Sequence, residues 1–140
     1  MIYLDTSAVV PLFVRESASD AVDAWLEACS ESLVSSDWLT TEFASALSIK
    51  VRRGELDAKQ ASVVWKDFED FCASGLRLLP VGRSAFAVAA KLTKDAGSGL
   101  RAGDSLHVAV ALDAGIKALA TADEVLARNA TAKGLSVTRF

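Results

Sequence analysis

Hydrophobic residues in this chain form two alternating kinds of pattern. Short apolar runs are typical of strands buried on both faces of a sheet. Longer stretches, with apolar residues three or four positions apart, predict helices. The short runs cover 2–4, 33–35, 76–81, 118–121 and 135–138, and the helical stretches cover 17–29, 38–53, a segment from 57 through 72, 83–95, 104–114 and 124–133.

This alternation predicts a three-layer α/β/α fold with a central, mostly parallel sheet of about five short strands, joined by right-handed crossovers. Two local features refine the pattern. Pro11 interrupts the apolar run 9–14, which we expect to form a short irregular helix. Ser17 and Asp20 have the spacing of a capping box at the start of the next helix.

Length and composition indicate one globular domain, residues 1–140. Hydrophobic residues make up 51% of the chain, enough for a real core. No apolar run approaches the ~18 residues of a membrane span, and a charge at Asp5 ends the first apolar run. We therefore expect a cytoplasmic protein with no signal peptide and no membrane partner. Two cysteines without a CxxC motif, and one histidine, argue against a structural zinc site.

The net charge of −3 argues, by itself, against a nucleic-acid partner, because such proteins usually carry a basic surface. The positions of the acidic residues change this picture. Asp5 directly follows the first predicted strand, Glu42 lies early in the helix after the second, Asp104 opens an apolar helix, and Asp123 follows the fourth strand. Strand ends and the starts of the following helices meet at one edge of a parallel sheet, so these four carboxylates can converge there.

Two of these acids lie among apolar residues. Glu42 sits next to Phe43 in the inward stripe of its helix, and Asp104 shares a helix face with Val108. An isolated buried charge is costly, so each carboxylate needs a partner or a shifted pKa. A divalent cation at the shared edge satisfies several acids at once. Oxygen ligands with a single histidine favour Mg²⁺ or Mn²⁺ over zinc.

Clustered carboxylates of this kind suit metal-dependent phosphodiester hydrolysis, with one or two ions. The hydroxyls of Thr6, Ser7 and Thr121 can hydrogen-bond the carboxylates or a metal-bound water, or they can be ordinary turn hydroxyls. Arg15 and Arg101 are candidate phosphate contacts, although ordinary solvated surface charge explains them as well.

Other interpretations remain open for single residues. Asp104 and Asp123 can be helix caps, Asp5 can end its strand in a turn, Glu42 can pair with Lys50 or Arg52, and His107 can orient Asp104 or be an ordinary buried histidine. Two other functions are also open: a non-catalytic module that binds RNA or a protein partner, and a phosphotransfer domain that uses Asp5. The second lacks the Asp-x-Asp turn of dehalogenase-like phosphatases, and the chain has no P-loop.

Four segments together carry a family resemblance: Asp5-Thr6-Ser7 after the first strand, Glu42, the stretch Leu-Arg-Ala-Gly-Asp-Ser-Leu-His at 100–107, and Thr121-Ala122-Asp123. They resemble the PIN-domain nucleases, and most closely the VapC toxins of VapBC toxin–antitoxin pairs. The resemblance covers essentially the whole chain. It implies a homodimeric endoribonuclease that depends on Mg²⁺ or Mn²⁺ and is inhibited by a VapB-like antitoxin. It also implies that the metal-binding acids are Asp5, Glu42, Asp104 and Asp123.

The predicted helix within 54–73 has two possible roles. Trp65, Phe68 and Phe71 share one helical face and can simply be core residues. The resemblance implies that helices in this region also form dimer and antitoxin surfaces.

Overall fold

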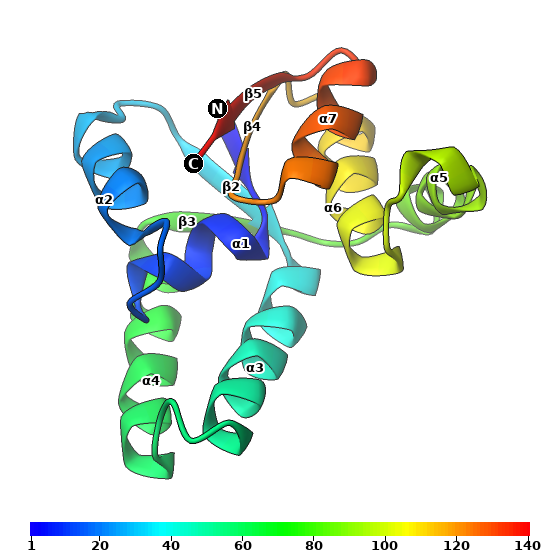
Figure 1. Ribbon diagram of the computed structural model, residues 1–140. Helices are drawn as coiled ribbons and strands as arrows, with labels where there is room; N and C mark the ends of the chain where they lie inside the picture. Colours follow the sequence, from blue (N-terminus) through cyan, green and yellow to red (C-terminus); the bar gives the residue numbers. More distant parts are fainter.

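The computed structural model describes residues 1–140, and its centre is a five-stranded sheet in which every strand pair is parallel (Figure 1). The strand order is β3-β2-β1-β4-β5. The strands are β1 (Ile2–Leu4), β2 (Leu33–Ser36), β3 (Leu76–Leu79), β4 (Ala118–Thr121) and β5 (Ser136–Arg139). The predicted three-layer α/β/α class is confirmed, and the sheet is wholly parallel.

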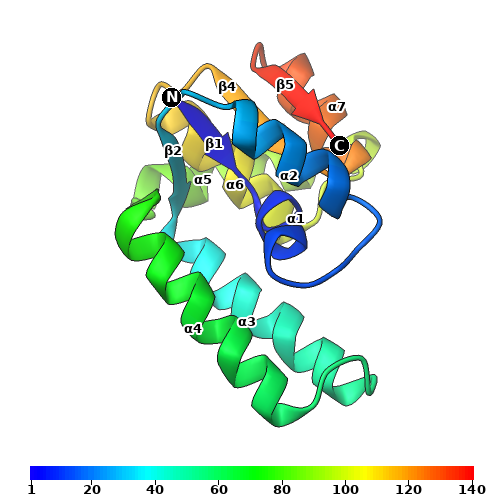
Figure 2. The same cartoon turned by 90° about the vertical axis from the view of Figure 1, so that its left-hand side faces the viewer.

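Seven α-helices and two short 3-10 helices connect the strands. The α-helices are α1 (Thr6–Val9), α2 (Ser19–Ala28), α3 (Asp37–Arg52), α4 (Ala58–Ser74), α5 (Arg83–Lys94), α6 (Ala102–Asp113) and α7 (Glu124–Ala132), and the 3-10 helices are η1 (Val10–Leu12) and η2 (Ala96–Ser98). The helices α3 and α4 extend away from the sheet side by side (Figure 2). None of the helices combines the length and the hydropathy needed to cross a membrane.

Strand register assigns alternate side chains to the two faces of the sheet. Tyr3 is aligned with Leu119 and Val34, and all three belong to the core beneath α5, α6 and α7. Leu4 is aligned with Ala120, and both face the opposite core beneath α1, α3 and α4. This alternation is what a parallel sheet covered on both faces requires.

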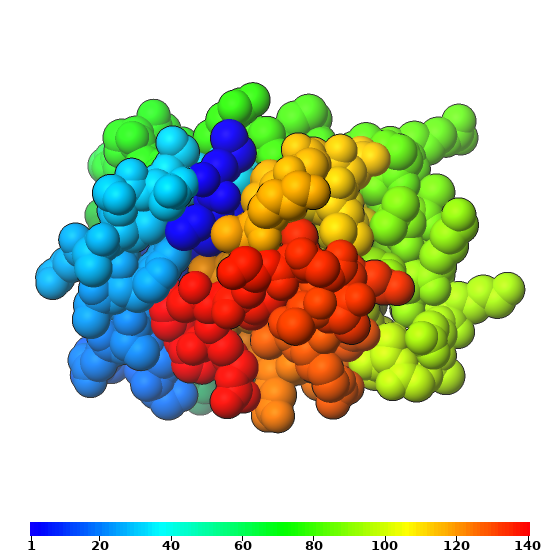
Figure 3. Space-filling model, turned by 90° about the horizontal axis from the view of Figure 1, so that it is seen from above, coloured from blue at the N-terminus to red at the C-terminus, as the bar shows by residue number.

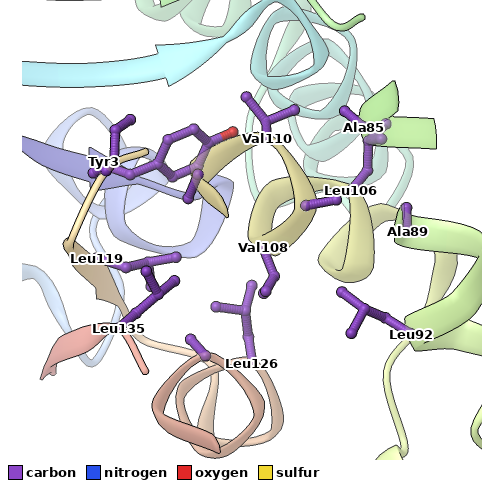
Figure 4. Packing of buried hydrophobic residues seen from close by; sticks show 14 of the residues in the cluster. Tyr3, Ala85, Ala89, Leu92, Leu106, Val108, Val110, Leu119, Leu126 and Leu135 are labelled. Atoms are coloured by element: carbon purple, nitrogen blue, oxygen red, sulfur yellow. The ribbon is translucent and has the colours of Figure 1, made fainter. Parts of the chain in front are cut away.

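The helix α6 is the most enclosed element, because every residue from Ser105 through Ala111 is buried. Figure 4 shows why: α6 lies between the strands, represented by Leu119, and the helices α5 and α7, represented by Leu92 and Leu126. A helix that is apolar on almost all sides is expected only in such a position. It holds the residues at its start in a fixed place relative to the sheet edge.

Aromatic side chains fill the opposite core. Phe43 of α3 stacks on Phe68 of α4 with ring centroids 3.9 Å apart and an interplanar angle of 8°. Phe13 meets both rings edge-on. Phe68 is buried, whereas Trp65 and Phe71 are only partly covered. This packing supports the core interpretation of Phe68. Elsewhere, Phe140 packs on Trp25, and Figure 3 shows the C-terminal residues beside α2.

Several element ends differ from the sequence-based expectation. Ser17 does not cap α2, which begins at Ser19 after Ala18 without a side-chain cap. Instead Ser19 Oγ donates to the Pro11 carbonyl at 2.8 Å and fixes the preceding loop. The strand β3 ends at Leu79, one residue before Pro80, which has no N–H for the ladder. The helix α6 begins two residues before Asp104, so Asp104 lies in its first turn and is not its N-cap.

Candidate functional site

All four predicted acids line one depression at the carboxyl edge of the sheet. Asp5 directly follows β1, and Asp123 follows the neighbouring strand β4 by two residues. Glu42 comes from α3 and Asp104 from α6, two helices that are in contact. The depression has a volume of about 350 Å³. Its other lining residues are Thr6, Ser7, Val10, Glu16, Ser45, Ala46 and Ile49.

Asp5 is the most deeply buried of the four acids, with 3% of its surface exposed. Its carboxylate accepts hydrogen bonds from Ser7 Oγ, 2.9 Å from each oxygen, and from Thr121 Oγ1 at 2.9 Å. The backbone N–H of Ala8 donates to it at 3.1 Å, so Asp5 also caps the short helix α1. Burial raises the pKa of Asp5, although the positive charge of a protonated His107 and these donors oppose the rise.

The hydroxyls beside Asp5 connect the loops after two neighbouring strands. Ser7 Oγ lies 3.0 Å from Thr121 Oγ1 and accepts a hydrogen bond from the Ala122 N–H at 2.8 Å. Thr121 Oγ1 accepts one from the Asp123 N–H at 2.9 Å. These bonds fix the position of Asp5 relative to Asp123.

Glu42 is held by groups other than the two basic residues considered from the sequence. Its Oε2 accepts a hydrogen bond from Thr6 Oγ1 and lies 2.7 Å from Nε2 of His107. Burial of Glu42 opposes ionisation, but His107 and Thr6 outweigh it and lower the pKa. The alternative partners are engaged elsewhere. Lys50 pairs with Glu16 and Glu55, and Arg52 bonds Ser48, so neither neutralises Glu42.

His107 is 1% exposed and contacts Glu42, with no hydrogen bond to Asp104. Sequence reasoning placed it one turn after Asp104 and missed this partner. A usable signal was present: Gly103 and His107 are four residues apart, so they share one face of α6. That face meets α3, because a Cβ on Gly103 would clash with Glu42 Oε1.

Asp104 and Asp123 complete the cluster. Burial raises the pKa of Asp104, and the negative charges of Asp123 and Glu42 add to the rise. Asp123 is the N-cap of α7, with Oδ1 accepting from the Leu126 N–H at 2.7 Å. The capping interpretation of Asp123 is therefore correct, and it coexists with a place in the depression. Burial is therefore the main cause of the raised pKa of Asp104, and the proximity of the other two carboxylates adds to it.

The side chains, as they stand, do not enclose an ion: no three carboxylates or histidines are close enough to hold a metal together. Asp5, Glu42 and Asp123 each direct an oxygen toward a donor of the protein. The donor set is nonetheless all oxygen apart from one histidine, which is the preference of Mg²⁺ and Mn²⁺. A hard divalent cation fits these residues better than zinc does.

The two candidate phosphate contacts lie outside the depression. Arg15 pairs with Asp20 at 2.8 Å, and its side chain is 71% exposed. Arg101 is exposed and directly precedes α6. Both arginines remain predictions as substrate contacts.

Solved structures with this fold include several toxin and antitoxin proteins. VapC20 of Mycobacterium tuberculosis, described as a sarcin-ricin loop cleaving toxin, is 16% identical with a TM-score of 0.76 and 100% coverage of both chains. The FitAcB structure from Neisseria gonorrhoeae is 21% identical with a TM-score of 0.75 over 99% of this chain and 97% of that one. VapBC2 from Rickettsia felis, bound to a promoter DNA fragment, is 17% identical with a TM-score of 0.68 over 99% and 98%.

These identities are low enough that the likeness shows a shared fold. No curated protein matches the sequence. The family model for the PIN domain does match it, over residues 2–132, which include all four acids of the depression. The chain belongs to the PIN domain family.

Proposed function

We propose that this protein is a divalent-metal-dependent endoribonuclease and the toxin of a type II toxin–antitoxin pair. The observation that carries the proposal is the convergence of Asp5, Glu42, Asp104 and Asp123 on one depression in a PIN domain. Mg²⁺ or Mn²⁺ is the proposed cofactor, and RNA is the proposed substrate. The toxin-like neighbours in the fold comparison support this choice among phosphodiester substrates.

The proposed ligands are the four carboxylates. A bound divalent cation would supply Lewis-acid chemistry: it makes water a better nucleophile near neutral pH and offsets negative charge on the phosphodiester. The protein's own part is to hold the carboxylates in position. Ser7 and Thr121 fix Asp5, and Thr6 and His107 fix Glu42. Because the hydroxyls of Thr6 and Ser7 are engaged in these bonds, we assign neither as a nucleophile.

Two other functions fit the site less well. A phosphotransfer domain needs an accessible acceptor carboxylate, whereas Asp5 is 3% exposed and both of its oxygens receive hydrogen bonds. A binding module without chemistry gains nothing from placing Asp104 beside Asp123 and Glu42, where burial first and then these two charges raise the pKa of Asp104. A cation site explains both the buried, hydrogen-bonded Asp5 carboxylate and the proximity of the other three acids.

Cleavage of a labelled RNA tests the proposal. We expect cleavage with Mg²⁺ or Mn²⁺ and none in excess EDTA. The variant Asp5→Asn, which keeps the size of the side chain, should lose at least ~100-fold in rate because a charged ligand is removed. Asp70→Asn is the matched control, since Asp70 is 68% exposed and pairs only with Lys66. Cleavage that continues in EDTA, or an Asp5→Asn enzyme of normal rate, would refute the metal mechanism.

The proposed partners are a VapB-like antitoxin and a second copy of this chain. The antitoxin is supported by neighbours described as VapBC2 and FitAB assemblies bound to DNA. We expect a small DNA-binding protein encoded beside this chain to co-purify with it and to suppress cleavage. Light scattering should give twice the 14.7 kDa mass of the chain if the predicted homodimer forms. A monomer under assay conditions would rule out the dimer without affecting the nuclease proposal.

A further inference from the structure

A row of buried polar groups leads from the candidate site into the core. It begins at the Glu42 carboxylate, continues to Nε2 of His107 at 2.7 Å, and passes from Nδ1 of His107 to the Tyr3 hydroxyl at 2.9 Å. The Tyr3 hydroxyl in turn lies 2.9 Å from Ser36 Oγ. Figure 4 shows Tyr3 among the core residues, with its hydroxyl directed toward α6.

Burial makes this row rigid. Tyr3 and Ser36 are 0% exposed and His107 is 1% exposed, so water does not compete for their hydrogen bonds. A buried imidazole nitrogen that loses its partner is left without a hydrogen bond and without compensating hydration. The Tyr3 and His107 rings also meet edge-on, with centroids 5.7 Å apart. The imidazole ring is therefore restrained on both sides.

The chemistry of the end groups determines the direction of each hydrogen bond in the row. An ionised carboxylate only accepts hydrogen bonds, so Nε2 of His107 must donate to Glu42. The Tyr3 hydroxyl donates its only proton to Ser36 Oγ at 2.9 Å. The Tyr3 oxygen is then left to accept a hydrogen bond from Nδ1 of His107. Every group has a partner in this arrangement.

We propose that Tyr3 and His107 are positioning residues that hold Glu42 in the geometry needed to bind a divalent cation. The inference rests on the proposed metal-dependent function and extends it to two core residues outside the carboxylate cluster. With Oε2 restrained by Thr6 and His107, rotation of the carboxylate is limited. Its remaining lone pairs then face a fixed direction. Outer partners of this kind typically contribute about 10- to 100-fold to metal affinity.

Three variants test the row. Tyr3→Phe removes one hydroxyl and leaves the ring in place. His107→Leu removes the donor to Glu42, whereas His107→Gln keeps an amide N–H that can reach the same carboxylate. Ser105→Ala is the control: Ser105 is on the same helix, is 0% exposed, and hydrogen-bonds Thr93 and the Ala102 carbonyl outside the row.

Mn²⁺ affinity, measured by calorimetry without RNA, is the first readout. We expect a loss of about 10-fold in Tyr3→Phe and a larger loss in His107→Leu, with partial recovery in His107→Gln. Ser105→Ala should lower the melting temperature but leave Mn²⁺ affinity unchanged. A purely structural role predicts that affinity in Tyr3→Phe equals that of the control, and this result would overturn the inference.

The second readout is the protonation pattern of the single histidine, observed by ¹⁵N NMR of the imidazole. We expect a proton on Nε2 in the wild type and a changed Nδ1 signal in Tyr3→Phe. A neutral His107 with its proton on Nδ1 would overturn the inference. Failure of the proposed function looks different: a wild type that binds Mn²⁺ but cuts no RNA contradicts the nuclease assignment and leaves the positioning role intact.

Discussion

Gly103 of α6 lies against the carboxylate of Glu42 so closely that a Cβ atom at position 103 would clash with Oε1. Gly103 does not have a positive φ, so its backbone alone does not require glycine. The requirement comes from the neighbouring side chain. The contact between Gly103 and Glu42 joins the start of α6 to α3. Gly103→Ala, which adds a single carbon, therefore tests whether the position of the Glu42 carboxylate matters.

Gly103→Ala should therefore separate stability from activity. Alanine is favoured over glycine in a helix by about 1 kcal/mol, but the added carbon displaces a carboxylate that Thr6 and His107 hold, and the two effects oppose each other. We expect a melting temperature close to that of the wild type, with RNA cleavage reduced at least ~10-fold because Glu42 is displaced. Gly82→Ala is the control, since its nearest contact would be 3.4 Å. Unchanged cleavage in Gly103→Ala would remove Glu42 from the proposed mechanism.

Asp104→Asn should stabilise the protein in the absence of metal, because it removes a negative charge that burial disfavours and that Asp123 and Glu42 also repel. The folded state raises the pKa of Asp104, so it binds the proton more tightly than the unfolded chain does. Stability from this group is present at low pH and is lost as pH rises through the folded pKa.

Thermal melts in EDTA from pH 4 to pH 8 measure this effect. The melting temperature of Asp104→Asn should equal that of the wild type near pH 4 and exceed it by about 3 °C near pH 7. Added Mn²⁺ should reverse the order, because the wild type gains more binding energy. A constant difference at all pH values would mean that ionisation of Asp104 is not the cause.

Asp123 has two roles that conservative substitutions separate. Asp123→Asn keeps an oxygen to accept from the Leu126 N–H, whereas Asp123→Ala loses both the cap and the charge. We expect Ala to cost about 1 kcal/mol in unfolding free energy and Asn to cost little. Both should reduce RNA cleavage and Mn²⁺ affinity. If Asn restores cleavage together with stability, Asp123 is only a cap.

Phe68→Ala tests the role of the aromatic face on α4. Phe68 is 1% exposed and stacked on Phe43, so truncation should cost about 3–5 kcal/mol of unfolding free energy in urea denaturation. Val63→Ala is the exposed counterpart on the same helix, at 56% exposure, and should change stability little. A small loss in Phe68→Ala would instead favour a partner-binding surface that is poorly packed in the isolated chain.

The period of the apolar pattern predicted the fold well, because a parallel sheet covered on both faces leaves few alternatives. The gathering of the four acids followed from the same topology. Local hydrogen bonds were harder to predict. Ser17 was expected to cap α2, but Ser19 and the Pro11 carbonyl decide how that loop is fixed. The Glu42–His107 contact depends on how α3 packs on α6, which sequence spacing alone does not specify.

The hydrogen bond between Thr121 and Asp5 joins residues 116 positions apart, and β4 must lie beside β1 for it to form. During translation, the amino-terminal part of the depression therefore has no partner until nearly the whole chain has left the ribosome. A product that stops before β4 would lack the strand that buries Asp5. Products that end before β4 should therefore lack the proposed nuclease activity.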